Sequence, residues 1–263
     1  NAENINRLDI LFAFVLGWAG FLIGLQTHIP SLKRFRRSHF WFTLINFLIT
    51  FCVTYLFLNY VKGFVGIRIN NGDILALSVA GGVTSPILIS LITKEYRISG
   101  RISYLLRFNA AFDNILGVVL LGFMIAFLSE AVLWQDVTLS LEMTAVMIAL
   151  AFLFALLYSV LSRQLRSEEE DRLMIISLLL FLLGTALLFG QSLLFTAFVF
   201  GLGVSNIQIS TKKLFLDIHN MEKPLYVLLL IYVGASLDYG GTDYLLLLLM
   251  FIVVHIISKY MAG

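Results

Sequence analysis

The chain has 263 residues, of which 60% are hydrophobic and 13% are charged, and its mean hydropathy is +0.94. Soluble globular proteins carry about 25% charged residues, so this composition excludes an ordinary soluble domain and predicts an all-α, multi-pass protein of the lipid bilayer. The formal net charge of +2 is too small to indicate a nucleic-acid partner, and the single cysteine, Cys52, excludes an internal disulfide.

Nine apolar segments follow one another along the chain, each near the ~18–20 residues that a helix needs to cross a bilayer. Helices are expected because lipid offers no partner to unpaired backbone groups. We interpret residues 1–263 as one transmembrane transport domain of about nine helices. The predicted segments cover residues 8–26, 40–61, 73–93, 103–128, 137–161, 173–190, 192–208, 224–238 and 243–261.

The loops between these segments differ in charge. Four alternate loops carry Lys33, Arg34, Arg36 and Arg37; Lys94, Arg97 and Arg101; Arg163, Arg166 and Arg172; and Lys212, Lys213 and Lys223. The N-terminal stub and the other loops carry only Arg7, Lys62 and Arg68. Because basic loops stay in the cytoplasm, this asymmetry predicts that the four loops are cytoplasmic and the N-terminal stub lies outside. A bacterial-type inner or plasma membrane is the expected location.

A helix break is predicted in segment 73–93, at Ala80-Gly81-Gly82-Val83-Thr84-Ser85-Pro86. Pro86 removes a helical donor and clashes with the preceding turn. Broken helices are tolerated inside a membrane where the released backbone groups face protein or a watery cavity, as they do at ion sites of transporters. A plain proline kink with close packing at the two glycines is the alternative.

Asp113 and Asn114 lie halfway along segment 103–128. An ionisable group at the bilayer centre costs at least roughly 2.5–3.5 kcal/mol, which makes it a candidate functional site. At ~1.5 Å per residue, Thr84 lies ~16 Å from one membrane surface and Asp113 ~15 Å from the other. The two depths coincide near the middle of a ~30 Å core, so we expect one shared site.

Other polar residues could extend this site. Asn109 lies four residues before Asp113 and therefore on the same helix face. In segment 243–261, Lys259 could either reach Asp113 or extend its ammonium to the inner surface. His255 precedes Lys259 by four residues, and a hydrogen-bonded helix contact is favoured there over a proton carrier.

Several short motifs, in order along the chain, resemble the membrane domain of monovalent cation/proton antiporters, closer to the Kef-type and bacterial sodium/proton branch than to the animal exchangers. The segment Phe21-Leu22-Ile23-Gly24-Leu25-Gln26 is similar to the family's F-L-x-G-L-E. Thr84-Ser85-Pro86 resembles its T-[SD]-P break. The remaining matches are Ala111–Gly117, Phe195–Gly201, Val233–Asp238 and Ser258-Lys259.

This resemblance implies an inverted-repeat, cation/proton antiporter-like fold with a broken midplane helix. It also implies further helices before and after this chain, a homodimer, and a cytoplasmic regulatory domain outside it. The chain would be no enzyme and would need no cofactor, since Na⁺ or K⁺ and H⁺ are transported. Asp113 would bind the monovalent cation, Thr84, Ser85 and Asn114 would add neutral oxygens, and Lys259 and Asn109 would pair with or modulate the site.

Two departures from the family pattern bear on function. Asn114 occupies the position where antiporters keep the ion-binding aspartate, and Gln26 stands where Glu is usual. One hypothesis is an antiporter in which Asp113 has taken over, so that Asn114→Asp would keep or raise transport. The alternative is a transport-deficient membrane sensor or effector with a structural Asp113–Lys259 pair. A solute symporter would need more polar residues near the break.

Overall fold

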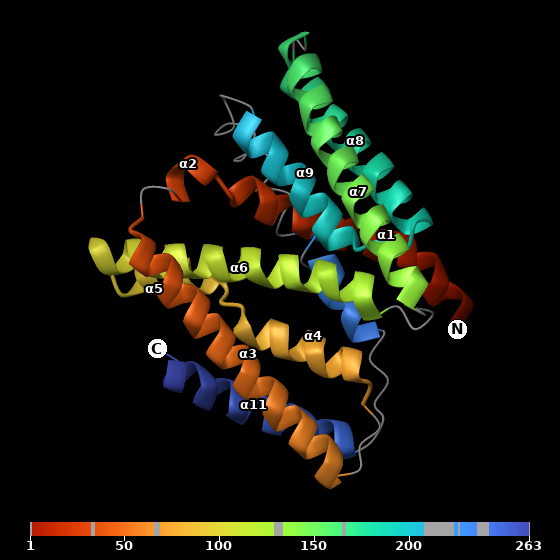
Figure 1. Ribbon diagram of the computed structural model, residues 1–263. Coiled ribbons are helices and arrows are strands. Elements are labelled where there is room, and N and C mark those ends of the chain that lie inside the picture. Colours follow the sequence, from red (N-terminus) through yellow and green to blue (C-terminus); the bar gives the residue numbers. More distant parts are fainter. Residues whose placement is uncertain are drawn as a thin grey trace. The chain divides into compact units, whose positions relative to one another are not determined.

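A computed structural model describes residues 2–32, 35–65, 69–128, 134–164, 167–207, 224–225, 227–235 and 242–262 (Figure 1). Every regular element in these ranges is a helix, and they contain no strand. The all-α prediction is therefore confirmed. The chain divides into two compact units, Asn1–Ile29 with Ile125–Leu237 and Pro30–Met124 with Asp238–Gly263.

The first unit is built around helix α9 (Leu193–Ile207). This helix packs against α1 (Ala2–Gln26), α7 (Trp134–Leu161) and α8 (Glu168–Leu188). Nearly all of its residues from Phe195 to Ser205 are buried, because it is covered on several sides. A helix that is apolar all round is expected at such a central position.

The junction of α8 and α9 depends on Gly190, whose φ of +61° is left-handed. The amide of Gln191 donates to the carbonyl of Ala186 at 2.8 Å, and the amide of Gly190 donates to Leu187 at 3.2 Å. These bonds form a C-terminal cap in which glycine avoids a Cβ clash. The predicted segments 173–190 and 192–208 are thus joined by a tight turn.

The second unit contains α3 (Arg37–Val65), α4 (Asn71–Gly82), α5 (Pro86–Glu95), most of α6 (Arg101–Leu128) and α11 (Thr242–Ala262). Helix α3 packs against both α4 and α11. Their shared core consists of buried apolar residues, with partly buried neighbours around them: Leu58, Ile69, Ile74, Tyr55, Leu77, Leu247 and Phe251. A four-residue helix α2 (Ile29–Leu32), which the apolar pattern did not predict, lies at the boundary of the units.

Four described helices are long and apolar enough to cross a membrane by length and composition: Arg37–Gly63, Arg101–Ile125, Ser140–Gln164 and Glu169–Leu188. Three further apolar helices are shorter, at Ile10–Gln26, Leu193–Ile207 and Leu246–Ala262. The predicted segment 224–238 is helical at 224–225 and 227–235, and its remaining residues lie outside the described ranges.

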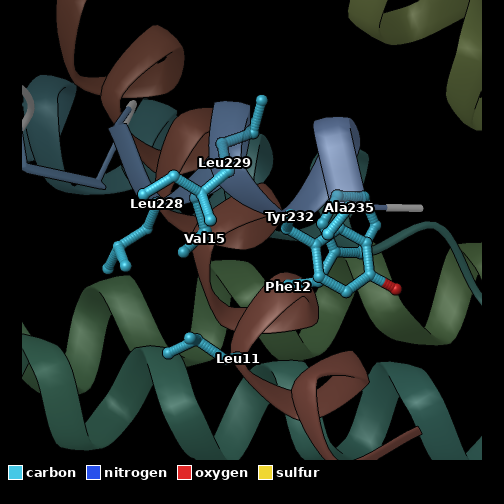
Figure 2. A pocket seen from close by; sticks show the side chains of 8 residues that line it. Leu11, Phe12, Val15, Leu228, Leu229, Tyr232 and Ala235 are labelled. Carbon is cyan, nitrogen blue, oxygen red and sulfur yellow. The ribbon is translucent and has the colours of Figure 1, made fainter. Parts of the chain in front are cut away.

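Helix α1 and residues 227–235 line an apolar pocket in the first unit (Figure 2). Within it, the rings of Phe12 and Tyr232 stack with centroids 4.4 Å apart. The other lining side chains are aliphatic: Leu11, Val15, Leu228, Leu229, Ile231 and Ala235. Such a surface offers packing rather than ion ligands.

Candidate functional site

The predicted break separates two helices rather than kinking one. Helix α4 ends at Gly82 and α5 begins at Pro86, with Val83 and Ser85 in extended conformations. Proline is favoured at the first helical position, where its missing amide is not needed. Ser85 is the N-cap, and its exposed side chain accepts a hydrogen bond from the amide of Leu88 at 3.3 Å. The structure thus places the Ser85 hydroxyl on the α5 amide.

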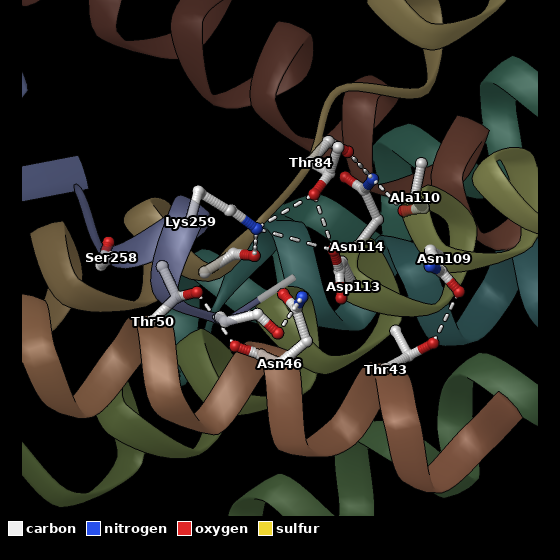
Figure 3. A network of polar contacts seen from close by, with 12 residues as sticks. Thr43, Asn46, Thr50, Thr84, Asn109, Ala110, Asp113, Asn114, Ser258 and Lys259 are labelled. Carbon is white, nitrogen blue, oxygen red and sulfur yellow. Dashed lines mark hydrogen bonds and ion pairs between the residues drawn. The ribbon is translucent and has the colours of Figure 1, made fainter. Parts of the chain in front are cut away.

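Thr84, inside the break, contacts Asp113 of α6 directly (Figure 3). The hydroxyl of Thr84 donates to Asp113 Oδ2 at 2.7 Å. Asp113 is only 3% exposed, and a buried carboxylate requires such partners. The juxtaposition expected from the two depth counts is present.

Asn114 binds the backbone rather than offering an oxygen to Asp113. Its amide nitrogen donates to the Thr84 carbonyl at 2.9 Å and to the Ala110 carbonyl at 2.7 Å. Because both partners are acceptors, the nitrogen and not the oxygen must face them. Asn114 therefore fixes the extended segment to α6.

Lys259 reaches the same cluster from α11. Its ammonium donates to the Gly82 carbonyl at 2.7 Å and to the Thr84 hydroxyl at 3.1 Å, and lies 3.8 Å from Asp113 Oδ2. Gly82 ends α4, and a cation there complements the unsatisfied carbonyls and negative end of the helix. Of the two directions open to Lys259 from the sequence, the structure shows the one toward Asp113.

The second carboxylate oxygen, Asp113 Oδ1, is buried and has no hydrogen-bond partner among the described residues. The other carboxylate oxygen, Asp113 Oδ2, accepts a hydrogen bond from Thr84 and lies near Lys259. One half of the carboxylate is therefore held in position while the other keeps its lone pairs. An oxygen of this kind can accept either a proton or a monovalent cation.

Asn109 lies one turn from Asp113 and serves a different contact. Its side-chain oxygen accepts a hydrogen bond from the Thr43 hydroxyl of α3 at 2.7 Å. Asn46 adds a second tie, since its amide nitrogen donates to the Ala262 carbonyl of α11 at 3.1 Å. These bonds join α3 to the two helices that carry Asp113 and Lys259.

Several contributors were not predicted, among them the Gly82 carbonyl, Thr43 and Asn46. A helix that ends at a Gly-Gly pair leaves unpaired carbonyls, so the first could have been anticipated. Thr43 and Thr54 are two of several threonines in an apolar helix, and their spacing alone does not distinguish them. Thr54 Oγ1 and His255 Nδ1 are both buried without hydrogen-bond partners among the described residues.

A model of a known protein family matches nearly the whole chain. The family described as "sodium/hydrogen exchanger, transmembrane" matches residues 2–263. No curated protein matches the chain as a relative. Together with its apolar helices, the match identifies an integral membrane protein, and the chain belongs to the sodium/hydrogen exchanger family.

Proposed function

We propose that the protein exchanges Na⁺ or K⁺ for protons by alternating access, with Asp113 as the shared binding group. Family membership supports cation/proton antiport in general terms. The observation that carries the finer proposal is the divided Asp113 carboxylate, in which Oδ2 is held by Thr84 while Oδ1 is buried without a partner among the described residues.

Competition at one carboxylate would couple the two flows. A deprotonated Asp113 attracts a monovalent cation, whereas a protonated Asp113 is neutral and does not. Because both ligands need the same oxygen, one leaves as the other binds. In transporters of this kind, one bundle moves against another around a fixed site near the midplane.

Lys259 would act as an internal competitor for the transported cation. Its ammonium lies 3.8 Å from Asp113 Oδ2 when it also binds Gly82 and Thr84. A Na⁺ or K⁺ ion at Asp113 would add a second positive charge at close range, which is unfavourable in a medium of low dielectric. We infer that Lys259 moves away from Asp113, and keeps its bond to the Gly82 carbonyl, when the cation binds.

The test is proton movement in proteoliposomes that contain the full-length protein. We expect an inward gradient of Na⁺, K⁺ or Li⁺, but not of choline, to drive protons out of the vesicles. Asp113→Asn should abolish this flux. Asp73→Asn, which changes an exposed acid at the start of α4, is the matched control and should retain it.

A membrane sensor without transport is the second candidate, and one observation favours it. The Lys259 ammonium already contacts three polar partners, so the pair could be purely structural. In that case the wild-type protein would show no flux with any of the three cations. That result would reject the antiport proposal.

A further inference from the structure

Two side chains with buried polar atoms, Thr54 and His255, lie beside Gly81 near the end of α4, one helical turn away from Lys259. Thr54 of α3 is fully buried, and its hydroxyl has no hydrogen-bond partner among the described residues. The same is true of Nδ1 of His255 on α11. Both atoms lie near Gly81: a Cβ built on this glycine would be 3.4 Å from Thr54 Oγ1 and 3.6 Å from His255 Nδ1.

Thr54 differs from other threonines of the same helix. Thr43 and Thr50 donate their hydroxyl protons to the carbonyls four residues earlier, at 2.9 Å each. Thr54 makes no such bond. A buried hydroxyl without a partner is costly, which points to a ligand on its open side.

The His255 ring is positioned by its neighbours on α11. It stacks on Phe251, with centroids 6.0 Å apart. His255 and Lys259 are four residues apart and share a helix face. Lys259 binds the carbonyl of Gly82, and His255 lies near Gly81. The two side chains therefore approach consecutive residues at the end of α4.

The chemistry of this space suits water. A buried water molecule typically makes about three hydrogen bonds to otherwise unsatisfied polar groups. Thr54 Oγ1 and His255 Nδ1 supply two, and the last carbonyls of a helix lack intrahelical donors and supply a third. One hydroxyl and one histidine nitrogen do not make a site for Na⁺ or K⁺, because hard cations are held by several oxygens.

We propose that Thr54, Gly81 and His255 bind one water molecule, which relays protons to the Asp113–Lys259 cluster. The absence of a Cβ at Gly81 provides the space. In each step the water accepts one proton and releases another, so it is neither consumed nor left charged. The relay rests on the proposed antiport, whereas the water site does not.

Two variants address the site by different means. Gly81→Ala would fill the space with a methyl group in ordinary van der Waals contact, and Thr54→Val would remove the hydroxyl with little change of volume. Thr50→Val is the matched control, since Thr50 is equally buried on the same helix but already bonded to Asn46. Gly63→Ala, also on α3, adds a methyl group where no atom lies within 4 Å.

The experiment combines an experimental map of the full-length protein with proteoliposome flux. We expect density for one water within hydrogen-bonding distance of Thr54 Oγ1 and His255 Nδ1, and its loss in Gly81→Ala. Proton flux at saturating cation should fall about tenfold in Gly81→Ala and Thr54→Val, the effect of losing one buried hydrogen bond. The half-saturating cation concentration should not change, and both controls should behave like the wild type.

The site is refuted if the map shows no water there, or if it shows a direct bond from His255 to Thr54 or to the backbone carbonyl of Gly81. The relay is refuted if Gly81→Ala and Thr54→Val keep wild-type flux, or if Thr50→Val loses as much. A wild-type protein that moves no protons would refute both the antiport and the relay. The density would then still decide the water site by itself.

Discussion

At the scale of single residues, the site depends on which partner each side-chain oxygen and nitrogen atom of Asp113 and Asn114 binds. Asp113 Oδ2 and Asn114 Nδ2 both hold Thr84, through its hydroxyl and its carbonyl respectively. Asp113 Oδ1 takes no part in this. Two adjacent side chains thus fix the extended segment and leave the buried Asp113 Oδ1 for an ion or a proton.

Lys259→Met should destabilise the protein and strengthen cation binding. Removing the cation of an ion pair whose carboxylate is buried leaves an uncompensated charge, and we expect a loss of about 3 kcal/mol in the free energy of unfolding. The cation would no longer compete with an ammonium, so its half-saturating concentration should fall. Thermal unfolding and flux assays would measure the two effects.

The double variant Asp113→Asn with Lys259→Met is the control for that prediction. It removes both charges, so most of the lost stability should return. If the double variant is as unstable as the two single losses added together, the pair contributes no interaction energy. Lys259 would then stabilise the protein only through Gly82 and Thr84.

Asn114→Asp should weaken the site rather than improve it. The sequence alone suggested that this change restores the family's aspartate and keeps or raises flux. In the structure, however, a carboxylate oxygen would face the carbonyls of Thr84 and Ala110, which are both acceptors. We expect a loss of roughly 1–3 kcal/mol in unfolding free energy and lower flux. A variant with wild-type stability and higher flux would show that Asn114 does not hold the break.

These residues show what a sequence can and cannot predict about a site. The meeting of Thr84 and Asp113 follows from helix length and depth, which depend only on residue counts. The orientation of the Asn114 amide depends on carbonyls that are 4 and 30 residues away, so residue type does not reveal it. The role of Ser85 could have been predicted, because a serine directly before a proline is a common helix start.

At the scale of elements, α4 and α5 are separated because of local chemistry. Pro86 cannot continue α4, and the two glycines before Val83 allow close approach of neighbours. A Cβ on Gly82 would lie 2.6 Å from the ring of Phe47, which is fully buried. The position of the break was therefore predictable, whereas the partner that requires Gly82 comes from α3, a contact that only the fold reveals.

The crossing of α1 and α9 depends on glycine at Gly201. A Cβ at this position would collide with the backbone carbonyl of Phe21, and backbone cannot move aside as a flexible side chain can. We expect Gly201→Ala to lower the free energy of unfolding by about 1–3 kcal/mol, which is a typical overpacking penalty. Thermal unfolding in detergent would measure this.

Gly184→Ala is the matched control for the crossing. Gly184 lies in α8 of the same unit, and a Cβ there would have no neighbour within 4 Å. Alanine in a helix should be neutral or stabilise it by roughly 0.5–1 kcal/mol. Equal destabilisation by both substitutions would contradict the close contact of α1 and α9.

At the scale of the whole molecule, the fold class and membrane character follow from composition and periodicity, and family membership agrees with them. The inverted repeat, and the arrangement of its two halves, stay predictions because they concern how distant segments are placed in space. Hydropathy reports only how each segment meets lipid. The sidedness of the loops is a separate property that charge alone predicts.

The basic loop at Lys33–Arg37 should lie on the cytoplasmic side. The four loops predicted to be cytoplasmic carry thirteen Lys and Arg residues, and four of these lie in this loop. Short basic loops resist translocation across the membrane. Ser38, directly after it, is exposed at the start of α3, which makes Ser38→Cys a suitable reporter. Cys52 is also exposed, so the experiment uses a Cys52→Ser background. An impermeant maleimide should label Ser38→Cys only after the cytoplasmic face is opened. Labelling of intact cells would invert the topology and, with it, the side from which protons and cations enter the Asp113 site.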